Sequence, residues 1–405
     1  MIKNKTTSLI ELAQESYSKE NMAKRYLKEY DKDGKKQRIL LIDVNCKYSS
    51  TGKIVYDLFN YLNLHGRDAR ICYGRGDLIK EKGIFKFGLD WETKIHAGLA
   101  RLTGYNGIFS PFSTKRLIKY IKHFKPDIIH IHELHAYFVN IKSLLKYIKK
   151  NNIKVVFTFH CEYMYTGKCG HAYSCDKYRR VCEKCPAVHE YPKSLFFDKT
   201  KQMFLMKKKL FENFDMRIVT PSPWLADRVK TSFLKDKPIK VIHNGIDTNI
   251  FHHVDASGLR YELGIPEVNK IVIAVAPDIM SDKKGGKWVL KLAEMMKGKN
   301  ITFILVGSIE IKKQQRALEN CIFLPPEKNI NKLVQYYSLA DIFVLFSERE
   351  TYSLTCAEAL CCGTPVVGFK CGAPETVFKE PYSKFFEYGD IFSVKKYLEN
   401  HLLGS

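Results

Sequence analysis

The segment 342–367 constrains the fold of this chain more than any other. An apolar run, Ile342 to Phe346, leads into a polar loop, and the pattern predicts a helix from about Leu354. Gly363-Thr364-Pro365 then ends that helix before a second apolar run begins at Val366. Strand, loop, helix and strand in this order form a βαβ unit, and open sheets built from such units bind ligands at the carboxyl ends of their strands.

The same alternation of short apolar runs and helical spacing recurs along the rest of the chain. The expected strands lie at 38–43, 69–73, 126–132, 154–160, 216–220, 239–243, 270–276, 301–307 and 342–346. Several of them are apolar throughout, as is usual in parallel sheets that are covered by helices on both faces. We therefore expect an α/β fold with two doubly wound, Rossmann-like parallel sheets.

Two carboxylates flank the start of the helix near Leu354. Glu350 lies in the loop, and Glu358 lies inside the helix. Backbone N–H groups at a helix N-terminus are unpaired and attract anions, so the amides of Tyr352, Ser353 and Leu354 are candidate ligands for a diphosphate. The two glutamates would then accept hydrogen bonds from the sugar and ribose hydroxyls of a nucleotide sugar. The alternative is an acidic residue favoured by the helix dipole and a solvated helix glutamate.

Glu350 and Glu358, followed by Ala359 to Val367, resemble the E-x7-E signature of retaining GT-B glycosyltransferases of family four. The resemblance implies that Glu350 contacts the donor sugar and that Glu358 binds the ribose hydroxyls. The family usually has Gly-Phe-Gly-Leu after the first glutamate, whereas this chain has Thr351-Tyr352-Ser353-Leu354. The resemblance spans roughly residues 38 to 390 and implies a GT-B fold, with two facing sheets and an interdomain cleft.

Further donor-binding residues are expected beside two glycines. Lys283 and Lys284 precede the helix that follows the strand at 270–276, and two lysines there can neutralise a diphosphate as point charges. The alternative is a solvated lysine pair. The resemblance implies contact with the donor pyrophosphate, with Lys283 replacing the arginine of the family. Gly52, in the small-residue loop after the first strand, allows close backbone approach by a ligand, although a plain βα turn explains it equally well.

Four histidines lie at strand ends: His130, His132, His135 and His160. They are candidates for a metal site, and we favour residues of a binding cleft or core. The resemblance places a histidine at position 160 near the donor sugar, but the usual His-Asp-x-Trp is replaced by His160-Cys161-Glu162-Tyr163. Together with Glu350 and Lys284 of the expected donor site, His160 completes the set of expected catalytic residues.

A loop after His160 concentrates cysteines. Cys169, Cys175, Cys182 and Cys185 have spacings that can close a tetrahedral thiolate shell around zinc. Clustered free thiols and redox chemistry are the alternatives. A loop from Thr-Gly-x-Cys to Cys-x2-Cys-Pro also resembles that of the colanic acid, capsular and exopolysaccharide glycosyltransferases of the same family. We expect a structural zinc that braces the loop and no catalytic metal.

The formal net charge of +23 indicates an anionic partner: nucleic acid, an anionic membrane leaflet or a phosphate-rich ligand. In Tyr191 to Phe211, aromatic residues, Met and Leu interleave with lysines, which suits an amphipathic element on an anionic membrane surface. The alternative is a helix whose apolar side packs on the domain. No apolar run approaches the length of a membrane span and no secretory signal is evident, so we expect a cytoplasmic location with peripheral contact at the inner face of the membrane.

The expected domains are a polar extension (1–37), an acceptor-side Rossmann-like domain (38–245) with a cysteine loop (161–186), a hinge (246–268), a nucleotide-sugar-binding domain (269–390) and a C-terminal helix or tail (391–405). The expected reaction moves a sugar, with retention, from a UDP- or GDP-sugar to a glycan or lipid-linked oligosaccharide acceptor in capsular or exopolysaccharide biosynthesis. Two alternatives stay open: a zinc-containing nucleic-acid-binding protein, although nucleic acid is not the expected partner, and a sugar-nucleotide epimerase.

Overall fold

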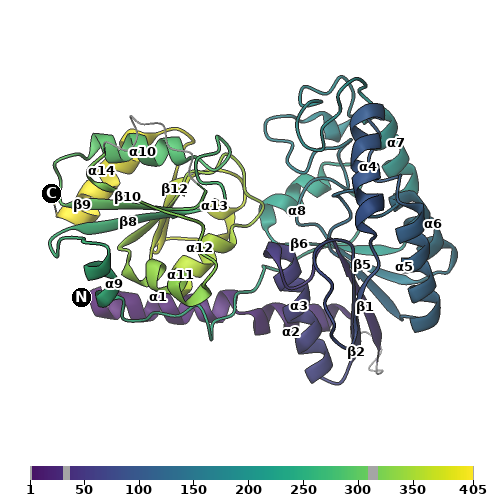
Figure 1. Cartoon of the computed structure of the whole chain (residues 1–405), viewed down its shortest axis with the longest axis horizontal. Helices are drawn as coiled ribbons and strands as arrows, with labels where there is room; N and C mark the ends of the chain where they lie inside the picture. The colour runs from purple at the N-terminus through teal and green to yellow at the C-terminus, as the bar shows by residue number, and fades with distance from the viewer. Residues whose placement is uncertain (1, 31–36, 309–317, 405) are drawn as a thin grey trace. The chain divides into compact units, whose positions relative to one another are not determined.

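The computed structural model describes residues 2–30, 37–308 and 318–404 of the chain. The chain divides into two compact units. The N-terminal unit comprises Met22–Asn244, and the C-terminal unit comprises Gly245–Ser405 together with Met1–Asn21. Each unit contains one parallel sheet with helices on both faces (Figure 1). The prediction of two doubly wound α/β sheets is therefore confirmed.

The sheet of the N-terminal unit has seven strands in the order β3-β2-β1-β4-β5-β6-β7, and all neighbours are parallel. The strands are β1 (Arg38–Asp43), β2 (Asp68–Tyr73), β3 (Ile84–Lys86), β4 (Ile128–Ile131), β5 (Lys154–Thr158), β6 (Met216–Thr220) and β7 (Ile239–Val241). Strands β2 and β3 extend the sheet on one side of β1, and β4 to β7 extend it on the other side. This reversal between β1 and β4 is a topological switch point, where open α/β sheets bind ligands.

Side chains of β1 alternate between two cores in this unit. Leu40 and Ile42 pack on the side of α5 (Pro111–Phe124), α6 (Ile141–Lys150), α7 (Thr200–Phe211) and α8 (Pro223–Lys230). Ile39 and Leu41 pack on the side of α2 (Lys19–Tyr30) and α3 (Ser49–Leu64). The period of two in a strand thus buries both of its faces, which is why the sequence of β1 is apolar without alternation.

The sheet of the C-terminal unit has six strands in the order β10-β9-β8-β11-β12-β13. They are β8 (Lys270–Val275), β9 (Ile301–Val306), β10 (Cys321–Leu324), β11 (Ile342–Leu345), β12 (Val366–Phe369) and β13 (Ser383–Phe386). One face carries α1 (Ile2–Tyr17), α9 (Ser257–Glu262), α11 (Ile330–Leu339) and α12 (Leu354–Cys361). The other face carries α10 (Gly286–Met295) and α14 (Ile391–Leu398). The switch point of this sheet lies between β8 and β11.

Residues 2–30, the described part of the predicted N-terminal extension apart from Gln37, differ from their prediction as a segment outside the main fold. Leu9 and Ala13 of α1 are buried in the core of the C-terminal unit, and the Tyr17 ring packs 5.3 Å from that of Phe378. In α2, Tyr26 is buried in the N-terminal unit and its hydroxyl lies 2.8 Å from Thr158 Oγ1. These helices hide a narrow apolar stripe under a mostly polar sequence, so composition alone misassigned them.

The segment Tyr191 to Phe211 also differs in part from its prediction. Only α7 within it is helical, and Met203, Phe204 and Phe211 of that helix are buried against the N-terminal unit. The apolar side of α7 thus packs on its own unit, as the alternative interpretation expected. Among the described residues no helix is long and apolar enough to cross a membrane.

Candidate functional site

The candidate donor site lies at the switch point of the C-terminal sheet. Strand β11 pairs with β8 on one side and with β12 on the other. The loops that leave the carboxyl ends of these three strands therefore meet at one edge of the sheet. They carry the predicted residues Lys283, Lys284, Glu350, Tyr352 and Ser353.

Lys284 and Glu350, which the sequence singles out separately, form an ion pair. Lys284 Nζ lies 2.7 Å from Glu350 Oε1, and both side chains are partly accessible to solvent. Backbone hydrogen bonds hold Glu350 at the sheet edge, since its N–H donates to Cys371 O at 3.0 Å and its carbonyl accepts from Ala373 N–H at 3.1 Å. The structure thus places a fixed carboxylate and a cation side by side where a ligand can reach them.

Gly285 allows the loop of Lys284 to lie against the next strand. Its φ of 77° is in the left-handed region, and a Cβ at this position would lie 2.1 Å from the carbonyl oxygen of Phe346. Only glycine fits such an approach. Lys283 is exposed, and its carbonyl accepts a 3.0 Å hydrogen bond from Glu348 N–H, so the two lysines occupy different environments.

The start of α12 combines a strained residue with a cap. Ser353 has φ 81°, and its hydroxyl accepts a hydrogen bond from Cys356 N–H as the N-cap of α12. Tyr352 is buried, with its ring 5.7 Å from that of Phe378. Leu354 packs against the same core. At Ser353 the backbone adopts the left-handed conformation that a glycine usually supplies. The serine in place of the usual glycine therefore keeps the same turn.

Glu358 lies on α12 and is half-buried. Tyr337 of α11 donates its hydroxyl to Glu358 Oε2 at 3.0 Å. Burial, and then the neighbouring Glu358 charge, raise the pKa of Tyr337 well above its ordinary value, so this hydroxyl stays a donor. Tyr337 therefore orients Glu358, and the sequence offered no signal for this pair because its members lie on different helices.

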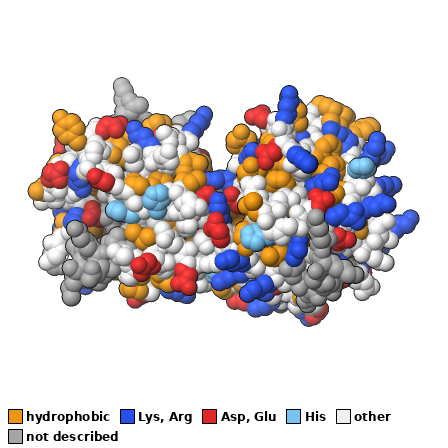
Figure 2. Space-filling model, turned by 90° about the horizontal axis from the view of Figure 1, so that it is seen from below, with side chains coloured by type: hydrophobic (Ala, Val, Ile, Leu, Met, Phe, Trp, Pro, Cys, Tyr) orange, Lys and Arg blue, Asp and Glu red, His pale blue; other side chains and the backbone are white. Residues whose placement is uncertain are grey.

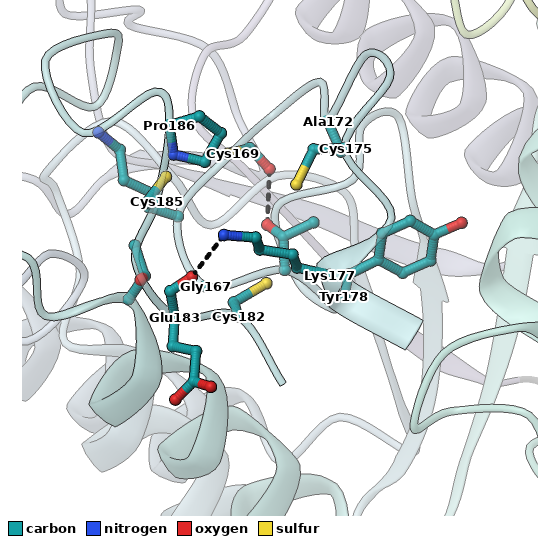
Figure 3. A pocket seen from close by; sticks show the side chains of 13 residues that line it. Gly167, Cys169, Ala172, Cys175, Lys177, Tyr178, Cys182, Glu183, Cys185 and Pro186 are labelled. Carbon is teal, nitrogen blue, oxygen red and sulfur yellow. Dashed lines mark hydrogen bonds between the residues drawn. The ribbon is translucent and has the colours of Figure 1, made fainter. Parts of the chain in front are cut away.

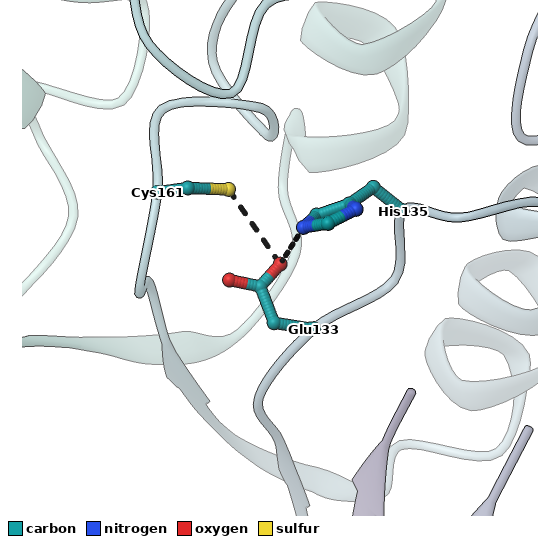
Figure 4. Close-up of side chains that lie close together, drawn as sticks. All are labelled: Glu133, His135 and Cys161. Carbon is teal, nitrogen blue, oxygen red and sulfur yellow. Dashed lines mark hydrogen bonds and ion pairs between the residues drawn. The ribbon is translucent and has the colours of Figure 1, made fainter. Parts of the chain in front are cut away.

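A second polar cluster lies at the switch point of the N-terminal sheet. Asp43 ends β1, while Glu133 and His135 follow β4 and Cys161 follows β5. His135 Nε2 lies 3.1 Å from Glu133 Oε2, and the Cys161 thiol donates to the same oxygen at 3.5 Å (Figure 4). Among the described residues, this is where three ligand atoms of His, Cys, Asp or Glu lie within 4.8 Å of one another.

The charges in this cluster are set by burial and by the Glu133–His135 pair. Burial, and then the Glu133 charge, raise the pKa of Asp43 to about 7. Burial disfavours the charge of Glu133, but His135 outweighs it and lowers the pKa of Glu133. In His135 the same pairing overcomes burial and raises its pKa well above the ordinary value. Glu133 and His135 are thus held as a partly buried ion pair.

His160 lies beside this cluster and is uncharged at neutral pH. Its Nε2 lies 3.0 Å from Nδ1 of His132. Burial lowers the pKa of His160 to about 4. His130 hydrogen-bonds to Tyr30 and Thr158 deeper in the unit, as a core histidine would. A neutral imidazole at a strand end can accept a hydrogen bond from a ligand hydroxyl or donate one to it.

Gly52 lies in α3, in a different unit from the other predicted donor-binding residues. A Cβ on Gly52 would lie 3.3 Å from the backbone of Asn45 and Cys46, so the close approach here is made by the chain itself. The glycine is explained by the β1–α3 turn, and its role toward a ligand stays a prediction.

The four predicted zinc ligands line one small cavity. Cys169, Cys175, Cys182 and Cys185 surround a space of about 20 Å³ in the loop between β5 and α7 (Figure 3). All four are half-buried free thiols. The chain thus brings the four cysteines together, although no three of their sulfur atoms lie within 4.8 Å of one another.

The sequence interpretation missed Asp43, Glu133 and Cys161 as members of a site. Each directly follows an apolar strand that was recognised, so the signal available was a polar residue at the carboxyl end of a buried run. The sequence does not give the strand order, and these loops come together only because β1 pairs with β4 and β4 pairs with β5.

Comparison with known proteins relates each unit to a glycosyltransferase domain. Residues 52–250 match the model of Glycosyltransferase Family 4, and residues 269–390 match that of Glycosyl transferases group 1. The colanic acid biosynthesis glycosyl transferase WcaC of Escherichia coli (strain K12) is 26% identical over 269 residues, 64% of either chain. N-acetyl-alpha-D-glucosaminyl L-malate synthase of Bacillus anthracis is 26% identical over 39% of this chain and 43% of its own. The chain thus spans less than two thirds of the length of these relatives.

Solved structures show that the fold is GT-B. Sucrose-phosphate synthase from Thermosynechococcus elongatus superposes with a TM-score of 0.63 over 91% of this chain and 90% of its own, at 17% identity. WaaG, a glycosyltransferase involved in lipopolysaccharide biosynthesis, has a TM-score of 0.59 over 90% of each chain, at 12% identity. The catalytic domain of Starch Synthase IV from Arabidopsis thaliana, bound to ADP and acarbose, reaches 0.62 over 92% of this chain and 93% of its own, at 15% identity.

Proposed function

Because the chain is built from a Glycosyltransferase Family 4 domain and a Glycosyl transferases group 1 domain, we propose that it transfers a sugar from a nucleotide diphosphate sugar to a glycan acceptor. The observation that carries this proposal is the Lys284–Glu350 pair at the switch point of the C-terminal sheet, next to the start of α12. A cation, a carboxylate and the backbone amides at the start of a helix suit the phosphates and the sugar hydroxyls of one donor molecule.

In the proposed donor complex, each residue has a separate role. Lys284, Lys283 and the amides near Ser353 stabilise negative charge on the diphosphate. Glu350 accepts hydrogen bonds from the sugar, and Glu358, oriented by Tyr337, accepts them from the ribose diol. The bound nucleotides of relatives by fold, such as ADP in the starch synthase structure, are consistent with a nucleoside diphosphate leaving group.

We propose that transfer retains the anomeric configuration and needs no catalytic metal. The bond from the sugar C1 to the phosphate oxygen breaks, a bond from C1 to the acceptor oxygen forms on the same face, and the acceptor proton passes to a phosphate oxygen. Lysine charge and helix amides then stabilise the leaving diphosphate. The polar cluster around His160 and Asp43 would bind the acceptor hydroxyls in the N-terminal unit.

The proposed acceptor is lipid-linked, in biosynthesis of a capsular or other exported polysaccharide. The similarity to a colanic acid biosynthesis protein and to the fold of a lipopolysaccharide biosynthesis enzyme supports this class of acceptor. A surface for an anionic membrane would then be needed. Figure 2 shows many Lys and Arg side chains at the surface, and the basic helices α5 and α6 expose most of theirs.

Helix α4 (Asp90–Thr103) is the proposed membrane surface because its apolar residues face outward and its polar residues face inward. Trp91 is 52% exposed, Ile95 53% and Leu102 50%, on the outward side of the helix. On the inward side Glu92 is 3% exposed and His96 is fully buried. A helix that turns its apolar residues outward exposes a surface that water disfavours, and such patches mark contact sites.

Neighbouring residues extend this surface into the α4 patch, which we define as Trp91, Ile95, Leu99, Leu102, Phe112, Leu195, Phe196 and Phe197. The Trp91 and Phe112 rings are 5.8 Å apart, and Leu195 N–H donates to Arg101 O at 2.8 Å. Exposed basic residues flank the patch: Lys94, Arg101 and Lys115. Aromatic and aliphatic side chains among cations suit insertion into an anionic leaflet.

The first experiment measures donor binding by calorimetry with UDP-, GDP- and ADP-sugars. We expect one nucleotide class to bind, and Glu358→Gln and Tyr337→Phe to weaken it about tenfold or more, while Glu348→Gln, an exposed glutamate nearby, leaves it unchanged. Product analysis with and without acceptor then separates transfer from epimerisation, which needs no acceptor. Absence of binding to every donor, together with salt-sensitive binding of DNA or RNA, would overturn the proposal.

The membrane surface is tested by sedimentation with vesicles of neutral or anionic lipid. We expect binding to anionic vesicles that falls at high salt and is lost in an Ile95→Ser, Leu99→Ser, Phe196→Ser variant. A matched variant, Leu78→Ser, Val268→Ser, Phe392→Ser, removes apolar residues elsewhere that are at least as exposed, and it should bind normally. Equal binding by both variants would show that the α4 patch is not the membrane surface.

A further inference from the structure

The loop between β5 and α7 is long and has almost no regular secondary structure. Residues 159–199 contain one short 3₁₀ helix, Lys177–Arg179, and no strand. Long loops without regular structure are uncommon in compact domains and require some other source of order. The cavity lined by Cys169, Cys175, Cys182 and Cys185 lies in the middle of this loop.

The cavity suits a single ion. Its volume of about 20 Å³ is close to the space that one water-sized sphere occupies. The cysteines come from separate turns of the loop, and Figure 3 shows them around the cavity. Thiolates in this number form closed tetrahedral zinc sites in proteins.

Backbone amides already point at two of the sulfur atoms. The N–H of Ala187 donates to the sulfur of Cys185, and the N–H of Gly167 donates to that of Cys182. Amide donors to sulfur are a stabilising outer layer around a thiolate-bound metal. A Cβ on Gly167 would lie 2.8 Å from Thr200 and 3.0 Å from Cys182 Cβ, so glycine is required for this approach.

Two buried lysines beside the cavity donate hydrogen bonds to backbone carbonyls, and among the residues that the structure describes neither forms an ion pair with a carboxylate. Lys207 is fully buried, and its Nζ donates to the carbonyls of Tyr163 and Thr166. Lys168 is 3% exposed and donates to the carbonyls of Ala187, Val188 and Glu190 at 2.7–2.9 Å. A buried cation is costly unless an opposite charge accompanies it.

The thiols of the cavity, once ionised, can supply that charge. Cys182, Cys169 and Cys161 lie within electrostatic range of Lys207. Cys185 and Cys169 are within that range of Lys168, as are the more weakly acting carboxylates of Asp198 and Glu190. A zinc ion with four thiolates carries a net charge of −2, which two lysine cations would neutralise. A metal–thiolate site would thus give both buried lysines a counter-charge, which a group of neutral thiols would not.

We propose that Cys169, Cys175, Cys182 and Cys185 bind one structural zinc ion, whose charge Lys168 and Lys207 balance. Binding joins the separate turns of the loop, and Lys207 ties them to α7. The sulfur atoms close around the ion by changes of cysteine rotamer, and each thiol releases its proton on binding. This proposal is independent of the proposed glycosyl transfer.

The experiment measures zinc in the full-length purified protein by mass spectrometry of the metal. We expect one zinc per chain in the wild type, and about a fivefold or greater loss in Cys175→Ser and in Cys182→Ser. Cys321→Ser, a half-buried cysteine elsewhere, is the matched control and should retain the metal. Loss of zinc in Cys161→Ser instead would assign the ion to the Glu133–His135–Cys161 cluster and overturn the proposal.

Two further measurements test the proposal even if a cysteine variant fails to fold. In the wild type, alkylation of the four cysteines should be slow until a chelator is added, and disulfides among them would contradict the proposal. Lys207→Met should release zinc to a chelator several-fold faster than wild type, whereas Lys208→Met, which alters an exposed neighbour, should not. Equal release from both variants would contradict the charge-balancing role of Lys207.

Discussion

At the scale of single residues, Ser353 combines two opposing effects at the start of α12. Its φ of 81° costs a non-glycine residue about 1 kcal/mol, while its hydroxyl caps the helix. Ser353→Ala keeps the strain and loses the cap, so we expect it to reduce the free energy of unfolding by about 1 kcal/mol. Ser353→Gly removes the strain and should be as stable as the wild type or more so. Urea denaturation measures both changes, and a glycine variant less stable than the alanine variant would contradict the argument.

Lys283 and Lys284 are adjacent in sequence but should differ in function. Lys284 pairs with Glu350, whereas Lys283 lies exposed on the loop. We expect Lys284→Met to reduce kcat/KM about 100-fold, because it removes charge from the leaving diphosphate and leaves Glu350 without its partner. Lys283→Met should cost about tenfold or less. Steady-state kinetics with the donor found by calorimetry checks both, and equal losses would mean that the ion pair has no special role.

At the scale of elements, Glu92 joins α4 to the start of α5. Its carboxylate accepts hydrogen bonds from the N–H groups of Phe112 and Ser113, at 2.8 Å and 2.7 Å, and lies at the positive end of the α5 dipole. We expect Glu92→Ala to lower the free energy of unfolding by about 2–3 kcal/mol, because it leaves buried helix amides unpaired. Asp90→Ala, two residues away and exposed, is the matched control. Thermal denaturation measures both, and equal small effects would contradict the capping role.

Elements were predictable from the sequence where a buried strand precedes a helix with an ordinary apolar stripe. The βαβ unit around Glu350 has that form, and its strands and helix are confirmed. Helix α4 could not be found in this way, because its apolar residues face outward and Glu92 and His96 face inward. The pairing of Lys284 with Glu350 was equally out of reach, since it depends on the strand order β8-β11-β12.

At the scale of the whole molecule, titratable histidines are distributed unequally between the two units. The histidines of the C-terminal unit, His252, His253 and His401, are exposed. In the N-terminal unit, burial lowers the pKa of His96 and of His160 to about 4, and that of His130 and His132 well below the ordinary value. The two units should therefore respond differently to acid.

The sign of the response follows from where protons bind. Between about pH 6.5 and pH 4 the unfolded chain protonates these histidines while the folded unit does not, so the free energy of unfolding falls as the pH falls. His96 and His160 each contribute on the order of 3 kcal/mol over this range. Asp43, whose pKa is raised to about 7, acts in the opposite direction over this range, whereas His135, whose pKa is also raised, has its effect above about pH 6.5.

We therefore expect the N-terminal unit to open first when the pH is lowered from 7 to 5. Hydrogen exchange measured by mass spectrometry at several pH values follows each unit separately, and amides of β4 and β5 should lose protection before those of β8 and β11. His96→Gln should weaken the pH dependence, because glutamine can accept from Gly107 N–H without titrating, whereas Asp43→Asn should steepen it. Earlier opening of the C-terminal unit, or an unchanged slope in both variants, would show that buried histidines do not control acid stability.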